Sequence, residues 1–178
     1  MSNSESGDSD KKMGGRNKLV SHHTVLVVGA GPAGVAAAQR LAENKIDVKV
    51  IEKRTIIGNP AQCGECVPKW GEVLGTFPRI TDDVWLEKYF DFPDYIIAQD
   101  LKTLRVFTPK MKVYGFKLDC FSSHRVQFDG LLAEMAKNAG AKITMNTALT
   151  KILKRKNNSE LYVTSNGRFT ADYVIDAS

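Results

Sequence analysis

The sequence lacks a long hydrophobic run and is poor in cysteine and aromatic residues. No stretch of about 18 apolar residues occurs, so no transmembrane helix is predicted. The first 18 residues contain no apolar segment of the kind that a secretory signal requires. The three cysteines are an odd number. Without an export signal, they predict a reducing, cytoplasmic compartment rather than a disulfide framework.

The charge also excludes one class of function. The formal net charge is +5, and the basic residues are scattered over Lys102–Lys117 and Lys151–Lys156 instead of forming one stripe. This distribution argues against nucleic-acid binding and leaves weak attraction to an anionic membrane surface or a phosphorylated substrate open. Residues 1–22 are expected to be a disordered leader, beside which His22 and His23 are solvated, and residues 23–178 to form one domain.

Residues 24–54 have the pattern of a dinucleotide-binding unit. The apolar run Val25–Val28 is typical of a strand buried on both faces, and the G-x-G-x-x-G turn of Gly29, Gly31 and Gly34 follows it directly. In such a turn the first glycine allows a tight bend, the second lets the backbone approach a pyrophosphate, and the third lets the helix pack closely on the strand. The helix that follows directs free N–H groups at the phosphates.

Glu52 stands at the end of the next predicted strand, Asp47–Ile51. A carboxylate there accepts hydrogen bonds from ribose hydroxyls and repels a 2′-phosphate, so FAD or NAD is favoured over NADP. Strand, helix and acidic residue together are far more specific than a glycine-rich turn alone. The other common phosphate loop is excluded because no Gly-Lys-Ser/Thr follows the turn.

An excursion over residues 55–120 separates this unit from the next helix–strand pair, which is predicted over residues 125–146. The aromatic residues of the excursion are expected in a core rather than in a lipid pocket; they are Trp70, Trp85, Phe90, Phe92 and Tyr95. An antiparallel meander is then predicted from Leu149–Leu153, Leu161–Thr164 and Arg168–Thr170. Asp172–Asp176 is predicted as a further buried strand. The predicted fold class is α/β, a Rossmann-like dinucleotide-binding domain with a parallel sheet plus an antiparallel β-meander.

Three short segments carry a narrower pattern: Glu52–Arg54, Ile57–Glu65 and Arg125–Asp129. The nucleotide-binding unit and the meander resemble the two-dinucleotide-fold flavoproteins, and these segments resemble the geranylgeranyl reductase family. The resemblance implies FAD as the cofactor and a reductase whose reduced flavin delivers hydride to carbon–carbon double bonds of a prenyl chain. It also implies a prenylated lipid substrate and peripheral contact with a membrane, and it does not indicate the electron donor.

The resemblance further implies roles for individual residues. The family's P-x-x-C-G motif maps onto Pro60, Cys63 and Gly64, beside the flavin and the substrate tunnel. Its R-x-x-F-D motif begins at Arg125, which reaches the cofactor, and ends at Asp129. Cys63 is the catalytic candidate. The predicted cofactor-binding residues are Gly29, Ala30, Gly31, Pro32, Ala33, Gly34, Glu52, Lys53, Arg54, Cys63, Gly64, Arg125 and Ala148.

Several of these residues have other interpretations. Cys63 could be a buried packing residue, or it could form a redox pair with Cys66. The two could also be half of a zinc site with Cys120 and His124, but the spacing is unusual and no metal site is predicted.

The charged candidates have structural alternatives as well. Lys53 and Arg54 could contact phosphate oxygens or be ordinary surface charges. A cation such as Arg125 at a helix start is unfavourable to the helix dipole, which favours a functional role, whereas Asp129 could simply stabilise the first turn.

Three functions remain open. The first is an FAD-dependent reductase of isoprenoid double bonds; the second is a non-catalytic FAD-binding fragment; the third is a fragment of a flavin-dependent aromatic hydroxylase. Family members continue past the strand equivalent to Tyr173–Asp176 into a second flavin motif and a substrate domain. The chain is therefore expected to be truncated before both, with a partner chain able to supply the missing half.

Overall fold

The computed structural model describes residues 20–63, 66–77, 84–154 and 159–178. The strands of one sheet are β1 (Val20–Val28), β2 (Val48–Ile51), β6 (Lys142–Thr144), β7 (Leu149–Lys154), β8 (Glu160–Thr164) and β9 (Arg168–Asp176). The second sheet contains β3 (Val67–Pro68), β4 (Ile97–Phe107) and β5 (Val113–Ser123), and the α-helices are α1 (Pro32–Glu43), α2 (Trp70–Thr76) and α3 (Arg125–Ala139). Within these residues, no helix has the length and apolar character needed to cross a bilayer.

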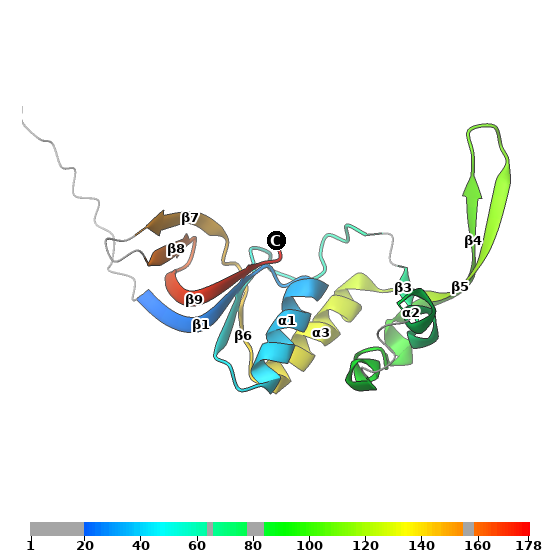
Figure 1. Cartoon of the computed structure of the whole chain (residues 1–178). Helices are drawn as coiled ribbons and strands as arrows, with labels where there is room; N and C mark the ends of the chain where they lie inside the picture. The colour runs from blue at the N-terminus through cyan, green and yellow to red at the C-terminus, as the bar shows by residue number, and fades with distance from the viewer. Residues whose placement is uncertain (1–19, 64–65, 78–83, 155–158) are drawn as a thin grey trace, which may run out of the picture.

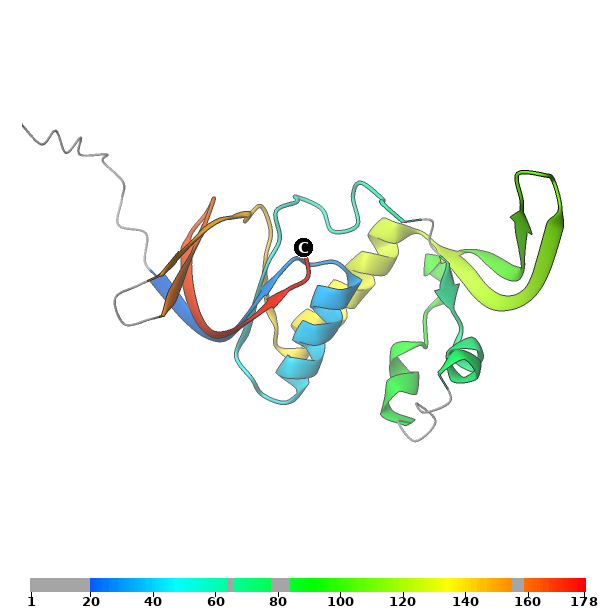
Figure 2. The same cartoon turned by 45° about the horizontal axis from the view of Figure 1, so that its top comes forward.

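The larger sheet has the strand order β6-β2-β1-β9-β8-β7. β1 pairs in parallel with β2 and β9, and β2 pairs in parallel with β6. α1 and α3 lie side by side against one face of these parallel strands (Figures 1 and 2). The core on this face consists of Val25, Val27, Ala30, Val35, Ala38, Ala42, Val48, Val50, Ala133, Ala136 and Ala141. Small residues on both helices let them approach the sheet and each other closely.

The meander covers the opposite face of the sheet. β7 pairs antiparallel with β8, and β8 with the start of β9. Leu26, Val28 and Ile51 of the parallel strands form a second buried cluster there with Tyr162 and Phe169. β1 is thus buried on both faces from Val25 to Val28, and the predicted α/β class with a parallel sheet and a meander is confirmed.

Two expected strand boundaries are wrong. β1 begins at Val20, which pairs with Arg168, so the last three residues of the expected leader belong to the sheet. Residues 1–19 lie outside the described residues. The third meander strand and the final strand are one strand, β9, because β1 pairs along its whole length. β9 is also not buried as expected, since Tyr173 is 70% exposed and Val174 is 37% exposed.

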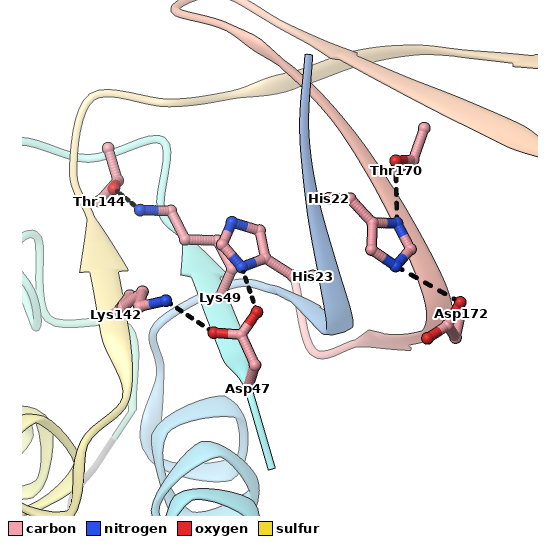
Figure 3. Close-up of polar contacts among 8 residues, drawn as sticks. All are labelled: His22, His23, Asp47, Lys49, Lys142, Thr144, Thr170 and Asp172. Atoms are coloured by element: carbon pink, nitrogen blue, oxygen red, sulfur yellow. Dashed lines mark hydrogen bonds and ion pairs between the residues drawn. The ribbon is translucent and has the colours of Figure 1, made fainter.

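A polar cluster joins the amino-terminal ends of the parallel strands (Figure 3). His23 is buried, and its Nδ1 lies 2.7 Å from Oδ2 of Asp47, whose Oδ1 accepts a hydrogen bond of 2.7 Å from Lys142 Nζ. The expectation of a solvated His23 is therefore wrong, because β9 pairs with β1 at this position and Asp47, just before β2, contacts the ring. His22 points the other way, is exposed, and lies 3.1 Å from Thr170 Oγ1.

The excursion contains α2, the 3-10 helices η2 (Val84–Tyr89) and η3 (Asp94–Ile96), and the hairpin of β4 and β5. The hairpin projects away from the rest of the molecule in both views (Figures 1 and 2). β3 pairs only with the base of the hairpin, through Val67 with Phe121 and Pro68 with Cys120.

The expected aromatic core is confirmed in part. Phe92 packs against Phe121 and Phe128, with ring centroids 5.6 and 5.3 Å apart. Phe90 lies between Trp70 and Phe92. Tyr95 is 59% exposed, so its assignment to a core is wrong. The side chain of Trp85 lies outside what the structure describes.

Candidate functional site

A cleft of about 540 Å³ opens at the carboxyl ends of β1, β2 and β9, beside the start of α1. In parallel α/β sheets this edge is where ligands bind, because the loops that follow the strands converge there. Its lining residues are Val28, Gly29, Gly31, Pro32, Ile51, Glu52, Lys53, Arg54, Gln62, Cys63, Arg125, Asp129, Thr147, Ala148, Leu149, Asp176, Ala177 and Ser178.

The three glycines of the turn occupy different surroundings. Gly29 has a φ of +102°, and a Cβ there would lie 2.5 Å from the carbonyl oxygen of Ala177. A Cβ on Gly34 would lie only 2.1 Å from the carbonyl oxygen of Gly29, so α1 packs directly on the turn. A Cβ on Gly31 would meet nothing within 4 Å. Gly29 and Gly34 thus shape the turn, whereas Gly31 leaves open space in the cleft wall.

Glu52 holds two parts of the cleft wall together. Glu52 is buried, with 7% of the residue exposed. Oε2 accepts a hydrogen bond of 2.8 Å from the N–H of Ala30, and Oε1 accepts one of 2.9 Å from the N–H of Arg54. A carboxylate has about four lone-pair sites, so Glu52 can still accept hydrogen bonds from a ligand in the cleft.

Arg125 and Asp129 form a paired group at another wall. Arg125 Nε and Nη2 donate hydrogen bonds of 2.9 and 2.7 Å to the two carboxylate oxygens of Asp129, one helical turn further along α3. The side chain of Asp129 is 2% exposed and that of Arg125 is 16% exposed. This two-point contact fixes the plane of the guanidinium at the cleft.

The loop after β2 supplies the remaining polar groups. Arg54 Nη2 donates a hydrogen bond of 2.5 Å to Oε1 of Gln62. Lys53 is exposed, and so is Cys63, so the interpretation of Cys63 as a buried packing residue is wrong. Gly64, the next predicted site residue, lies outside the described residues.

The cleft brings together most of the predicted site residues, from segments far apart in the chain. Gly29, Gly31, Pro32, Glu52, Lys53, Arg54, Cys63, Arg125 and Ala148 all line it. Three predicted residues do not line it. Ala30 and Gly34 are buried behind the wall, and Ala33 is exposed on α1 outside the lining.

Sequence reasoning missed several lining residues. Gln62 lies in the loop after β2, Thr147 follows β6, and Asp176 ends β9. Their position just beyond parallel strands was the available signal. It could not be used without knowing that β6 and β9 join the same sheet as β1.

Cys66 has a second cysteine beside it, Cys120 of β5. Burial, followed by contact with the Cys66 side chain, raises the pKa of Cys120 to about 11. Cys66 therefore lies next to Cys120, across β3 and β5. In the part of the chain that the structure describes, no three His, Cys, Asp or Glu side chains come together as a metal site.

The residues present fit an adenine dinucleotide. Gly31 leaves room for a pyrophosphate at the start of α1, where the first N–H groups of the helix have no intrahelical acceptor. Glu52 can accept from ribose hydroxyls, and Lys53, Arg54 and Arg125 are cations at the same cleft.

Comparison with protein families and curated proteins agrees with this fit. The family model described as FAD dependent oxidoreductase matches residues 24–178. The chain is 35% identical over 130 residues to a protein of Methanosarcina barkeri called "Uncharacterized protein in nifH2 5'region", covering 73% of this chain and 68% of that one. It is 35% identical over 142 residues to a digeranylgeranylglycerophospholipid reductase of Methanocella arvoryzae, covering 76% of this chain but 32% of the reductase.

Solved structures show the same fold. A geranylgeranyl bacteriochlorophyll reductase-like protein from Thermoplasma acidophilum superposes with a TM-score of 0.70 and 26% identity, over 90% of this chain and 40% of that one. The halogenase PltM in complex with phloroglucinol and FAD has a TM-score of 0.65 at 17% identity, over 88% of this chain and 34% of the halogenase. The similarity to the halogenase shows the fold alone. The chain thus spans about a third of the matched reductase and two fifths of the reductase-like structure.

Proposed function

Because the chain belongs to the FAD dependent oxidoreductase family, we propose that it is the FAD-binding part of a reductase that saturates carbon–carbon double bonds of isoprenoid chains. One observation carries the proposal: an open glycine turn, a ribose-type carboxylate and a fixed arginine share one cleft in a chain 35% identical to a digeranylgeranylglycerophospholipid reductase. FAD is the cofactor of this family.

The proposed roles follow from the geometry. The N–H groups at the start of α1 bind the pyrophosphate, and Gly31 leaves the approach open. Glu52 accepts hydrogen bonds from the adenosine ribose. Arg125 is held by Asp129 at the cleft wall, where its remaining N–H groups bind and orient the cofactor. When bound and reduced, FAD supplies hydride for the double bond.

Cys63 is proposed to face the reacting part of the cofactor. It lines the cleft on the loop after β2. A compact, polarizable thiol there can shield the flavin from water or hold a proton. The substrate we propose is a prenylated lipid, on the strength of the name of the Methanocella arvoryzae reductase.

The first experiment is a visible absorption spectrum of the purified 178-residue chain with and without added FAD. We expect stoichiometric binding, with oxidised flavin bands that shift on binding. Glu52→Ala should weaken FAD binding by about 1–3 kcal/mol. The variant removes the acceptor for the ribose hydroxyls, and it also removes the buried acceptor for the N–H groups of Ala30 and Arg54. Glu134→Ala, at an exposed position of α3, is the matched control. Unchanged affinity in Glu52→Ala would refute the assigned site.

A second candidate is FAD binding without catalysis by this chain alone. It is favoured by the coverage, since the chain spans 32% of the reductase that it matches. Anaerobic incubation with chemically reduced FAD and a geranylgeranyl lipid, followed by mass spectrometry, separates the two candidates. A mass gain of two hydrogens per saturated bond supports the reductase, and FAD binding with no mass gain supports the second candidate.

A further inference from the structure

Two of the three cysteines meet at the base of the hairpin of β4 and β5, although they are far apart in the sequence. Cys66 is the residue before β3, and Cys120 lies in β5. Their side chains contact each other. Two thiols in contact can be oxidised to a disulfide bond.

The strand register explains this contact. Pro68 of β3 pairs with Cys120, and Val67 pairs with Phe121. Alternate residues of a strand share a face of the sheet, and so do directly paired residues. Cys66 is two positions before Pro68, so it lies on the same face as Cys120, diagonally across the two strands.

The segment before β3 has the freedom that a bond requires. A disulfide needs Cβ atoms about 3.5–4.5 Å apart, which is closer than a regular diagonal pair of strand residues allows. Cys66 lies outside β3 and is not part of the ladder that fixes β3 on β5. Its backbone can therefore move the remaining distance toward Cys120.

The two thiols differ in their access to an oxidant. Cys66 is exposed, whereas Cys120 is buried. Burial also raises the pKa of Cys120 to about 11, so Cys66 is the thiol that reacts first. In a reducing compartment, a bond between such thiols is transient and responds to the redox state.

The pair stands between two segments that line the cofactor cleft. Cys63, three residues before Cys66 in the sequence, lines the cleft on the loop after β2. β5, which carries Cys120, ends at Ser123, two residues before Arg125 at the start of α3. A bond between Cys66 and Cys120 would therefore fasten one wall of the cleft to the strand that leads into another.

We propose that Cys66 and Cys120 form a reversible disulfide bond that fastens the loop after β2 to β5. The oxidant is a low-molecular-weight disulfide such as oxidised glutathione. The Cys66 thiolate attacks one sulfur of this disulfide and releases the first small thiol. The thiol of Cys120 then loses its proton, and its sulfur displaces the second small thiol from Cys66. The two cysteines lose two protons and two electrons, and the small disulfide gains them as two thiols.

This bond goes beyond the proposed reductase function, because it requires neither FAD nor a prenyl substrate. FAD binding by the reduced chain tests the cofactor site, and cross-linking tests the cysteine pair. The failure of one proposal would therefore leave the other standing.

The test is incubation of the full 178-residue chain, at low concentration, with oxidised glutathione, followed by trypsin digestion without reduction and mass spectrometry. Trypsin releases Cys120 in the peptide 118–125, and it releases the other two cysteines together in the peptide 55–69. We expect these two peptides to be linked in the monomeric chain, and dithiothreitol to separate them.

Two serine variants identify the cysteine that bonds to Cys120. Cys66→Ser should lose the link between the peptides. Cys63→Ser is the matched control, because it makes the same chemical change at a neighbouring exposed cysteine, and it should keep the link. Both positions are exposed, so the fold should persist, and circular dichroism verifies this.

The fastening is measured by a thermal melt. The linked chain should melt at least about 4 °C above the reduced chain, because a cross-link over a long loop restricts the unfolded state. Cys66→Ser should melt at the same temperature with and without oxidised glutathione.

Several outcomes would overturn the proposal. They are a link that persists in Cys66→Ser, a bond confined to the peptide 55–69, glutathione adducts without a link, and a link found only in a covalent dimer. An unchanged melting temperature of the linked chain would also overturn it, since the bond would then fasten nothing.

Discussion

Gly31 and Gly34 belong to the same turn but should respond to substitution in opposite ways. Gly34→Ala places a methyl group 2.1 Å from a backbone oxygen, so either α1 or the turn must move. We expect a loss of about 1–3 kcal/mol in the free energy of unfolding. Gly31→Ala meets open space and should leave stability unchanged or raise it by about 0.4–1 kcal/mol.

FAD binding reverses this order of severity. The methyl group of Gly31→Ala projects into open space at the start of α1, so this stable variant should lose FAD affinity. Urea unfolding and FAD titration of both variants provide the comparison. If Gly31→Ala bound FAD normally, the pyrophosphate would not lie against this part of the turn.

At the scale of elements, the polar cluster of Figure 3 joins β1, the start of β2 and β6 through Asp47. The hydrogen bond from Lys142 lowers the pKa of Asp47 below its ordinary value, and the contact with His23 acts in the same direction. A carboxyl group with a lowered pKa in the folded state contributes stability above its unfolded pKa. That contribution is lost as the pH falls through the folded-state pKa.

Asp47→Asn should therefore be less stable than the wild type at neutral pH, and the difference should vanish in acid. Because 40% of the Asp47 side chain is exposed, we expect a difference below about 1 kcal/mol. Urea unfolding of both proteins between about pH 3 and about pH 7 measures it. A difference that does not change with pH would mean that hydrogen-bond geometry, and not charge, links the strands.

The pairing of β3 with β5 determines the reactivity of the cysteines. Cys120 is 2% exposed and its pKa is raised to about 11, so it holds almost no thiolate at neutral pH. Cys63 and Cys66 are exposed. Iodoacetamide at neutral pH should label these two before Cys120, and peptide mass spectrometry shows the order. Early labelling of Cys120 would indicate that β3 separates readily from β5.

At the scale of the whole molecule, FAD should stabilise the domain as one unit. The cleft is lined by residues that follow β1, β2, β6 and β9 and by α3, so a ligand there links segments from Val28 to Ser178. FAD at about 100 times its Kd should add about 2.7 kcal/mol to the free energy of unfolding. A thermal melt with and without FAD detects this gain. An unchanged melting temperature at saturating FAD would contradict a shared cleft.

Local pattern was enough to predict the nucleotide-binding unit. The apolar run before Gly29, the helix after it, and Glu52 at the end of β2 all follow from nearest-neighbour chemistry and periodicity. The same is true of α3, which ends at Gly140 with a φ of +113° in the left-handed region. Each feature depends on residues that are close together in the chain, so the sequence could determine it.

Which residues of different elements contact each other was decided by the tertiary structure alone. Two contacts join residues that are distant in the chain: the N–H group of Ala30 with Glu52, and Asp47 with the buried His23. The length and exposure of β9 were likewise decided by its register with β1. A one-residue shift of register moves every side chain to the other face, and no local signal in this sequence specifies the register between distant strands. The sequence by itself determined the cofactor-binding unit, and the sheet that brings distant strands together determined the site around it.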